Sequence, residues 1–297
     1  MLSAPRGPNG IIPRVLNLLH LSRVDYLVIG HLSMDLSSDG ARLGGTAAYA
    51  GLTARALGLS VGIVTALKPG TDLARLHDIP IVTVPSQENT TFENIVEPGA
   101  RRQVLHARAA RIGAQHVPEV WRTSSIVHLG PIANELDPGL PGAISPSLLG
   151  VTPQGWMRTW DASGQVRPGL WDESDDLLAQ AGAVVLSMED VAFDLELVEA
   201  MAQKTRVLCV TDGPGGAVVY WHGDRRRFRA PVMQEVDATG AGDIFAAAFF
   251  TRLQSTRDPW EAARMATLLA SRSVARPGLD AIPTRSEIEE GLVEVLT

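Results

Sequence analysis

The feature that most constrains the fold is a repeated pairing of apolar runs with helical segments. Residues 26–30 form a nearly continuous apolar run, residues 46–57 are rich in alanine, Gly58 follows, and residues 61–65 are apolar again. A strand that is apolar on both faces is typical of a parallel sheet covered by helices on either side. The pattern therefore predicts an α/β domain with a mostly parallel central sheet.

The same alternation continues to the end of the chain. Further core strands are predicted at 79–84, 125–129, 148–151, 183–186 and 207–211, and helices at 195–203, 241–254 and 259–275. We expect one domain over 25–297, preceded by an N-terminal extension over 1–24 that begins with Pro, Gly and Arg residues.

Two segments show the alternation of β-hairpins instead. Residues 92–97 and 101–107 alternate polar and apolar side chains around a turn at Pro98 and Gly99. This hairpin, at about 90–110, is predicted to project from the main sheet as a small lid. A second hairpin is predicted over 218–230, and we interpret its run of three arginines, 225–227, as a solvated tip rather than a phosphate site.

The composition restricts the classes of function. The formal net charge is −7, which argues against a nucleic-acid partner. The single cysteine, Cys209, cannot form an internal disulfide, and this fits a reducing compartment. No uncharged run is long enough to span a bilayer, and Pro13 and Arg14 interrupt the early apolar stretch of a would-be signal peptide. We therefore expect a cytoplasmic protein without membrane or nucleic-acid partners.

The segment most informative about chemistry is the start of the helix predicted at 241–254. Gly240, Ala241 and Gly242 open this helix, and unpaired backbone N–H groups at a helix N-terminus suit a phosphoryl group. Asp243 would repel phosphate there unless it had a separate task, such as accepting the proton of an attacking hydroxyl. The alternative is that Asp243 only stabilises the first helical turn.

Two further segments have the composition of ligand loops. Residues 211–216 follow a predicted strand and contain three glycines, which permit close approach of a ligand, although a tight turn explains them equally well. Asp35 follows the first strand, and Gly44 and Gly45 precede the next helix. These residues would bind sugar hydroxyls, or they are a loop acid and a helix start.

The order of these three segments resembles the ribokinase (PfkB) family of carbohydrate and nucleoside kinases. Residues 237–243, Asp-Ala-Thr-Gly-Ala-Gly-Asp, are very similar to the C-terminal signature of that family, and Gly44 with Gly45 is similar to its N-terminal signature. The resemblance extends over about 25–297. It implies a ribokinase-like three-layer αβα sandwich with a mostly parallel central sheet and a reduced β lid.

The resemblance also implies ligands and residue roles. ATP is the implied phosphoryl donor, with Mg²⁺ as cofactor and, in part of the family, K⁺ near the first Asp of the signature. The residues concerned are Gly240, Ala241, Gly242 and Asp243 for catalysis; Thr211, Gly213, Gly216, Thr267 and Ala270 for the nucleotide; Asp35, Gly44 and Gly45 for the acceptor; and Asp237 for the monovalent ion. For Thr267 and Ala270, apolar helix packing is the competing explanation.

The sequence departs from the family pattern in its lid and its metal element. Only eight residues separate Asp35 from Gly44, too few for a lid of several strands, so the 90–110 hairpin is expected to be the main cover. The Asn-x-x-Glu element of the family corresponds here to Ser187-Met188-Glu189-Asp190. We assign Ser187 and Asp190 to the water shell of Mg²⁺, with Glu189 as the alternative.

A third departure concerns the acceptor. Tyr49 replaces the polar residue that often follows the Gly-Gly pair, which argues against ribose itself. Gln154 and Arg158 follow a predicted strand, where ligands gather in open α/β sheets, and they would shape the acceptor site unless they belong to a surface loop. The compact lid and residues 90–93 are somewhat similar to inositol kinases.

The leading hypothesis is therefore transfer of the ATP γ-phosphoryl group to a small sugar, polyol or nucleoside. The alternative is a non-catalytic sugar or nucleotide sensor on a kinase fold, motivated by the short lid and the altered metal element. A dinucleotide-dependent oxidoreductase is a poor fit, since no Gly-x-Gly-x-x-Gly follows the first strand. A homodimer formed through the lid hairpin is a further expectation.

Overall fold

The computed structural model describes residues 21–37, 40–97, 100–171 and 174–292, so most of the predicted N-terminal extension lies outside the described residues. A nine-stranded sheet runs through the molecule in the order β15-β14-β13-β12-β9-β8-β1-β4-β5. Only β14 runs antiparallel to its neighbours, β13 and β15, and all other pairs of this sheet are parallel, which confirms the predicted mostly parallel sheet. The strands are β1 (Tyr26–Ile29), β4 (Val61–Leu67), β5 (Ile81–Pro85), β8 (Ile126–Leu129), β9 (Leu148–Val151), β12 (Ala183–Ser187), β13 (Val207–Thr211), β14 (Ala217–Trp221) and β15 (Asp224–Phe228).

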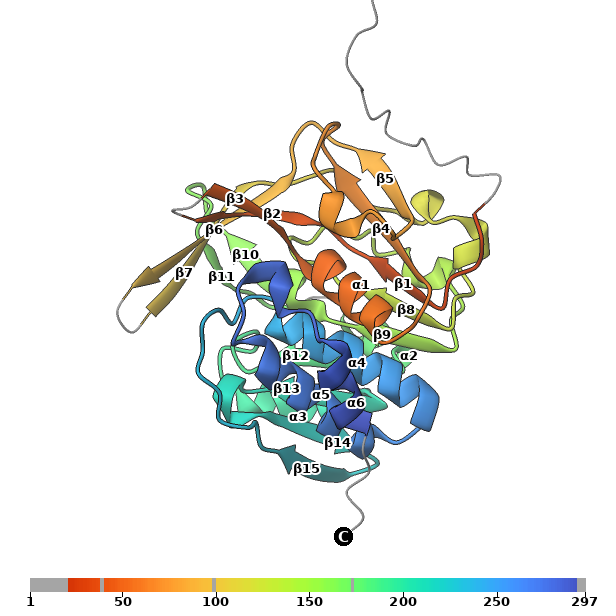
Figure 1. The fold of residues 1–297 in the computed structure, drawn as a ribbon, viewed down its shortest axis with the longest axis vertical. Helices are drawn as coiled ribbons and strands as arrows, with labels where there is room; N and C mark the ends of the chain where they lie inside the picture. Colours follow the sequence, from red (N-terminus) through yellow and green to blue (C-terminus); the bar gives the residue numbers. More distant parts are fainter. Residues whose placement is uncertain (1–20, 38–39, 98–99, 172–173, 293–297) are drawn as a thin grey trace, which may run out of the picture.

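Helices cover both faces of this sheet because successive side chains of each strand point to opposite faces. In β1, Tyr26 and Val28 join the core under one helical layer, while Leu27 and Ile29 join the core under the other. The first layer holds α1 (Thr46–Ala56), α4 (Ala241–Thr256), α5 (Pro259–Ser273) and α6 (Arg285–Leu292), and the second holds α2 (Ser174–Gln180) and α3 (Leu195–Lys204). Figure 1 shows α1, α4, α5 and α6 in front of the sheet. The predicted three-layer αβα sandwich is confirmed.

A separate four-stranded sheet, ordered β3-β2-β6-β7, forms the lid. Its outer hairpin is β6 (Thr90–Glu97) with β7 (Ala100–Ala107), and its inner hairpin is β2 (Ser33–Ser37) with β3 (Gly40–Gly44). The expectation that the eight residues between Asp35 and Gly44 are too few for a lid of several strands is wrong, because the lid sheet has four strands. This stretch supplies part of β2 and most of β3, which pair antiparallel from Ser33 with Gly44 to Ser37 with Gly40.

The lid sheet projects from one end of the main sheet (Figure 1). Its strand β2 starts four residues after β1 ends, and β6 pairs parallel with β2. A small hairpin of β10 (Arg158–Trp160) and β11 (Val166–Pro168) reaches β7, where the N–H of Leu105 donates to the carbonyl of Gly164 at 2.8 Å. The lid is thus anchored both to β1 and to the segment that follows β9.

The three-arginine run lies elsewhere than predicted. Arg225, Arg226 and Arg227 occupy the edge strand β15 rather than the tip of a hairpin. Their guanidinium groups lie 3.3 Å from carboxylates of Glu199, Asp224 and Asp212, respectively. Charged side chains along an edge strand discourage the addition of a strand from another chain. This role explains the three arginines without a bound ligand.

The N-terminal boundary of the packed region differs slightly from the predicted one. Val24 is buried, and the indole N–H of Trp121 donates to the carbonyl of Ser22 at 2.9 Å. Residues 22–24 therefore pack with the domain. Within the described ranges, no helix combines the length and apolar character needed to cross a bilayer.

Candidate active site

The start of α4 is open to the surroundings. Gly240 caps the helix with φ 81°, a left-handed conformation that favours glycine, and Gly242 is exposed. A Cβ built on Gly242 would meet no atom within 4 Å. Since the first N–H groups of a helix have no acceptor within it, this end presents donors to an approaching anion. The N–H of Ala241 is the exception among the predicted donors, because it donates to the carbonyl of Ala238 at 3.2 Å.

Asp243 lies in the first turn of α4 and is held by a residue of α1. The hydroxyl of Thr46 donates to its Oδ1 at 2.6 Å. Burial raises the pKa of Asp243 to about 6, while the hydrogen bond from Thr46 acts in the opposite direction. A carboxylate with a pKa near neutrality, beside a helix N-terminus, has the properties of a general base.

The charges around Asp243 come from distant parts of the chain. The pKa of Asp243 is lowered by the positive charge of Arg158 and raised by the negative charges of Asp35 and Asp190. These residues belong to β10, β2 and the loop after β12. The fold thus brings four predicted site residues within electrostatic reach of one another, an arrangement that a role in helix stability alone does not require.

Gly44 is needed for close packing against Asp35, and Gly45 for close packing against the backbone of His31. A Cβ on Gly44 would stand 2.2 Å from Oδ2 of Asp35, and a Cβ on Gly45 would stand 2.8 Å from the carbonyl oxygen of His31. Gly45 also has φ 86°. The hydroxyl of Ser33 donates to Oδ1 of Asp35 at 2.9 Å, so the carboxylate is oriented from both sides.

The two residues predicted after β9 differ in how well the structure places them. Arg158 is the first residue of β10 and acts on the charge of Asp243, so it lies at the site and not in a remote surface loop. Gln154 lies in the short helix η6 (Pro153–Gly155), directly after β9, and is half-buried. Its contact with an acceptor stays a prediction.

The predicted nucleotide residues follow β13 and lie on α5. Gly213 has φ 46° and open space around it, which suits a ligand loop. Gly216 has a packing reason instead, because a Cβ there would stand 1.9 Å from the carbonyl oxygen of Phe228. Thr211 ends β13, and its hydroxyl donates to the carbonyl of Leu186 at 3.3 Å.

On α5, packing accounts for both predicted residues. Thr267 is only 5% exposed, and Ala270 packs against the core of the first helical layer. Ala270 keeps part of its surface exposed, whereas Thr267 is almost fully covered. Contact with the nucleotide therefore stays a prediction for these two residues.

The predicted metal residues lie in two places. At the end of β12, the N–H and hydroxyl of Ser187 donate to Oδ2 of Asp190 at 2.8 and 2.9 Å. Asp237 accepts from the N–H groups of Thr239 and Gly278 at 2.9 and 3.0 Å, and so joins two loops. In the described part of the chain, no three His, Cys, Asp or Glu side chains gather as a metal cluster.

The oxygen atoms of Ser187 and Asp190 suit Mg²⁺ better than a metal ion whose ligands all come from the protein. Mg²⁺ prefers hard oxygen ligands and usually keeps waters and substrate phosphates around it. The hydroxyl of Ser187 and the carboxylate of Asp190 are such oxygens, and Asp190 acts on the charge of Asp243. They suit an ion whose remaining ligands come from phosphate and water.

Sequence reasoning missed the roles of Thr46 and Tyr49, which lie one turn apart on α1. A Cβ on Gly240 would stand 2.3 Å from the ring of Tyr49, so this ring supports the start of α4. Burial raises the pKa of Tyr49, and the charges of Asp35, Asp237 and Asp243 raise it further. Their position in the sequence could have indicated these roles, because they follow Gly44 and Gly45 and, at i and i+3, lie on the same face of the helix.

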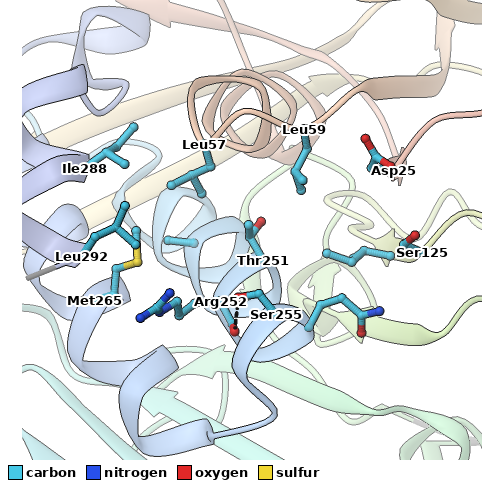
Figure 2. A pocket seen from close by; sticks show the side chains of 13 residues that line it. Asp25, Leu57, Leu59, Ser125, Thr251, Arg252, Ser255, Met265, Ile288 and Leu292 are labelled. Carbon is cyan, nitrogen blue, oxygen red and sulfur yellow. Dashed lines mark hydrogen bonds between the residues drawn. The ribbon is translucent and has the colours of Figure 1, made fainter. Parts of the chain in front are cut away.

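A hollow lies toward the end of α4 opposite to Asp243. It has a volume of about 360 Å³ and is lined mainly by apolar side chains, including Leu57, Met265 and Ile288 (Figure 2). Thr251 of α4 and Asp25, which precedes β1, also line it. No predicted site residue lies in its wall, so it is separate from the candidate active site.

Comparison with known proteins shows which proteins the chain is similar to. Residues 173–285 match the model of the pfkB family carbohydrate kinases. The chain is 28% identical over 192 residues to a fructokinase of Escherichia coli, covering 57% of this chain and 61% of the relative. It is 27% identical over 274 residues to a cytidine kinase of Thermococcus kodakarensis, covering 82% of this chain and 93% of the relative. The chain is thus similar to carbohydrate and nucleoside kinases of the PfkB/ribokinase family.

Solved structures show the same fold. A pyrophosphate-dependent kinase of the ribokinase family, complexed with a pyrophosphate analogue and myo-inositol, superimposes with a TM-score of 0.73 at 19% identity, over 90% of this chain and 100% of its own. A putative ribokinase II of Escherichia coli, solved in complex with ATP and Mg²⁺, superimposes with a TM-score of 0.69 at 19% identity, over 92% of this chain and 99% of its own. The chain spans 48% to 61% of the length of three fructokinase relatives.

Proposed function

We propose that this protein is a kinase that transfers the γ-phosphoryl group of ATP to a hydroxyl of a small polyol, sugar or nucleoside. The observation that carries the proposal is the placement of Asp243 in the open first turn of α4. A carboxylate with a pKa raised to about 6 is poised to take a proton at neutral pH. Backbone donors of the same turn offer the phosphoryl group its binding site.

The transfer assigns a task to each part of the site. The acceptor lies between the lid and α4, with Asp35 and Arg158 binding its hydroxyl groups. Asp243 takes the proton of the attacking hydroxyl as its oxygen bonds to the γ-phosphorus, and the bond from that phosphorus to the β–γ bridging oxygen breaks. The N–H groups of Gly240 and Gly242 stabilise the charge on the equatorial oxygens, and ADP leaves.

Mg²⁺, when bound, would neutralise the phosphate charge. Ser187 and Asp190 would hold its water shell, and Asp237 would lie nearest the monovalent cation. Thr211 and Gly213 would border the nucleotide, together with Gly216 and the α5 residues Thr267 and Ala270.

An exposed apolar segment supports ATP rather than pyrophosphate as the donor. Val232, Met233 and Val236 are 101%, 39% and 61% exposed in the segment between β15 and α4. This segment is tied to the end of α5, where the N–H of Val236 donates to the carbonyl of Val274 at 2.8 Å. Apolar side chains beside the phosphoryl site offer a purine a surface to cover, and pyrophosphate has no group that would use it.

The charged lining supports a polyhydroxylated acceptor. Asp35 accepts hydrogen bonds and Arg158 donates them, and both lie within electrostatic reach of the base. Tyr49 is 2% exposed and belongs to the core, so the acceptor meets the lid and Arg158 rather than a polar side chain on α1. Since the pyrophosphate-dependent relative of similar fold was solved with myo-inositol, inositols head the acceptor panel.

The test is a product screen with purified protein. ADP release from ATP and orthophosphate release from pyrophosphate are measured in parallel over inositols, pentoses, hexoses and nucleosides, with Mg²⁺ and with or without K⁺. Acceptor-dependent ADP release supports the proposal. Release from pyrophosphate alone would change the donor, and binding of acceptor and nucleotide without turnover would support a sensor instead.

A further inference from the structure

Thr46 makes a contact with the base that the family signatures do not explain. It is the first residue of α1, it is 2% exposed, and its hydroxyl donates to Oδ1 of Asp243 at 2.6 Å. The distance is at the short end for hydrogen bonds between oxygens, as expected when the acceptor is ionised. Two helices that begin 195 residues apart thus meet through their first turns.

The side chain of Thr46 is also held in place sterically. A Cβ on Gly130 would stand 2.4 Å from the Cγ2 methyl of Thr46, so Gly130 leaves space for this methyl group alone. Gly130 follows β8 and Thr46 follows Gly45 of the lid junction. The methyl group of Thr46 thus packs on Gly130 while its hydroxyl is bonded to Asp243.

We propose that Thr46 is the positioning residue of the catalytic base, holding Oδ1 of Asp243 so that Oδ2 faces the acceptor hydroxyl. The inference rests on the proposed kinase activity and extends it. In the transfer, the acceptor O–H bond breaks and its proton goes to Oδ2, while the Thr46 hydroxyl keeps its own proton and its hydrogen bond to Oδ1. Thr46 does not touch the substrate.

This arrangement also couples the lid to the base. Strand β3 ends at Gly44, which packs on Asp35, and Thr46 follows after only one residue. A displacement of β3 would therefore reach the acceptor-binding carboxylate and the base through the same three residues. Orientation of Asp243 is in this way tied to the position of the lid.

The charged and titratable groups that face Asp243 influence its pKa, through which the Thr46 hydrogen bond can be measured. They are Asp35 from β2, Arg158 from β10 and Asp190 after β12, while Tyr49 of α1 and Tyr26 of β1 respond to its charge. Replacing Thr46 with Val removes a hydrogen bond to the ionised carboxylate and leaves these charges unchanged. Ionisation of Asp243 should then become harder.

Helix α1 supplies a matched control. Thr53 lies on the same helix and is 0% exposed, and its hydroxyl has no hydrogen-bond partner among the described residues. Thr53→Val makes the same chemical change at an equally buried site away from the base. Thr46→Ser separates the hydroxyl from the methyl group, because it keeps the first and removes the second.

The experiment compares wild type, Thr46→Val, Thr46→Ser and Thr53→Val. For Thr46→Val, we expect the acid limb of the kcat/KM profile to move up by about one pH unit, and kcat at pH 6 to fall about fivefold with little change in the KM of the donor. Thr46→Ser and Thr53→Val should follow the wild type. A Thr46→Val profile that superimposes on that of Thr53→Val would overturn the assignment, as would a Thr46→Ser profile shifted like Thr46→Val.

A second measurement does not depend on turnover. The carboxyl carbon of Asp243 is titrated by ¹³C NMR in the same four proteins, with Asp243→Asn identifying its resonance. An upward shift of the midpoint in Thr46→Val alone supports the positioning role even if no acceptor is phosphorylated, in which case only the proposed function fails. Equal midpoints in all four proteins would overturn the inference even if the wild type is an active kinase.

Discussion

Gly240 lies against the ring of Tyr49 so closely that a Cβ would stand 2.3 Å from Cδ1. The contact joins the residue before α4 to the first turns of α1, and Gly240 meets it with φ 81°. The donors of the candidate anion site are therefore positioned by an aromatic ring from the helix that follows the lid.

The first prediction uses the contrast between Gly240 and Gly242. Gly240→Ala adds a methyl group against the Tyr49 ring at a strained φ. We therefore expect the free energy of unfolding to fall by about 1–3 kcal/mol and activity to be lost. Gly242→Ala meets no protein atom within 4 Å. It should keep the melting temperature of the wild type and weaken donor binding. Thermal denaturation measures the stability of each variant, and the donor KM measures its donor binding. Equal melting temperatures for the two variants would refute the packing of Gly240 on the Tyr49 ring.

The second prediction concerns the base itself. Asp243→Asn keeps an acceptor for the Thr46 hydroxyl but cannot take a proton, so kcat should fall by roughly 10²–10⁴-fold with nucleotide binding largely preserved. Steady-state kinetics and calorimetric titration with ATP measure the two quantities. Asp176→Asn is the control, because Asp176 is an exposed acid in the first turn of α2. If both variants keep near-normal activity, Asp243 only stabilises the first turn of α4 and is not the base.

The third prediction is a pH dependence. Below pH about 6, Asp243 is protonated and cannot act as a base, because burial has raised its pKa. The kcat/KM of the wild type should therefore rise tenfold per pH unit below this value and level off above it. Rates from pH 4.5 to 8, with the folded state checked at each pH, measure the profile. A profile that is flat between pH 5 and 7 would exclude this carboxylate as the titrating group.

The fourth prediction separates acceptor from donor. A methyl group on Gly44 would stand 2.2 Å from Oδ2 of Asp35 and must displace this carboxylate. Gly44→Ala should therefore raise the KM of the acceptor by about tenfold or more while the donor KM changes little. Gly139→Ala is the control, since a Cβ there meets nothing within 4 Å. An unchanged acceptor KM in Gly44→Ala would remove Asp35 from the acceptor site.

Local patterns predicted most of the central sheet. Strands β9 and β13 have the predicted bounds, and α4 extends the predicted helix by two residues. Short apolar runs of four or five residues, rich in Leu and Val and bounded by turn-forming or polar residues, are typical of buried strands, so these two elements could be predicted without knowledge of distant partners. Strands β2 and β3 were missed because their side chains are mostly half-buried or exposed, and antiparallel pairing with each other rather than an apolar run makes them strands.

The sequence by itself determined the parallel α/β domain and the signature that ends in Asp243, since both depend on residues close together in the chain. Only the tertiary structure decided that Thr46 binds Asp243 and that Asp35, Arg158 and Asp190 surround it. The physical reason is that a periodic pattern reports which face of an element is buried, whereas the partner it meets there depends on the crossing of strands and helices far apart in the chain.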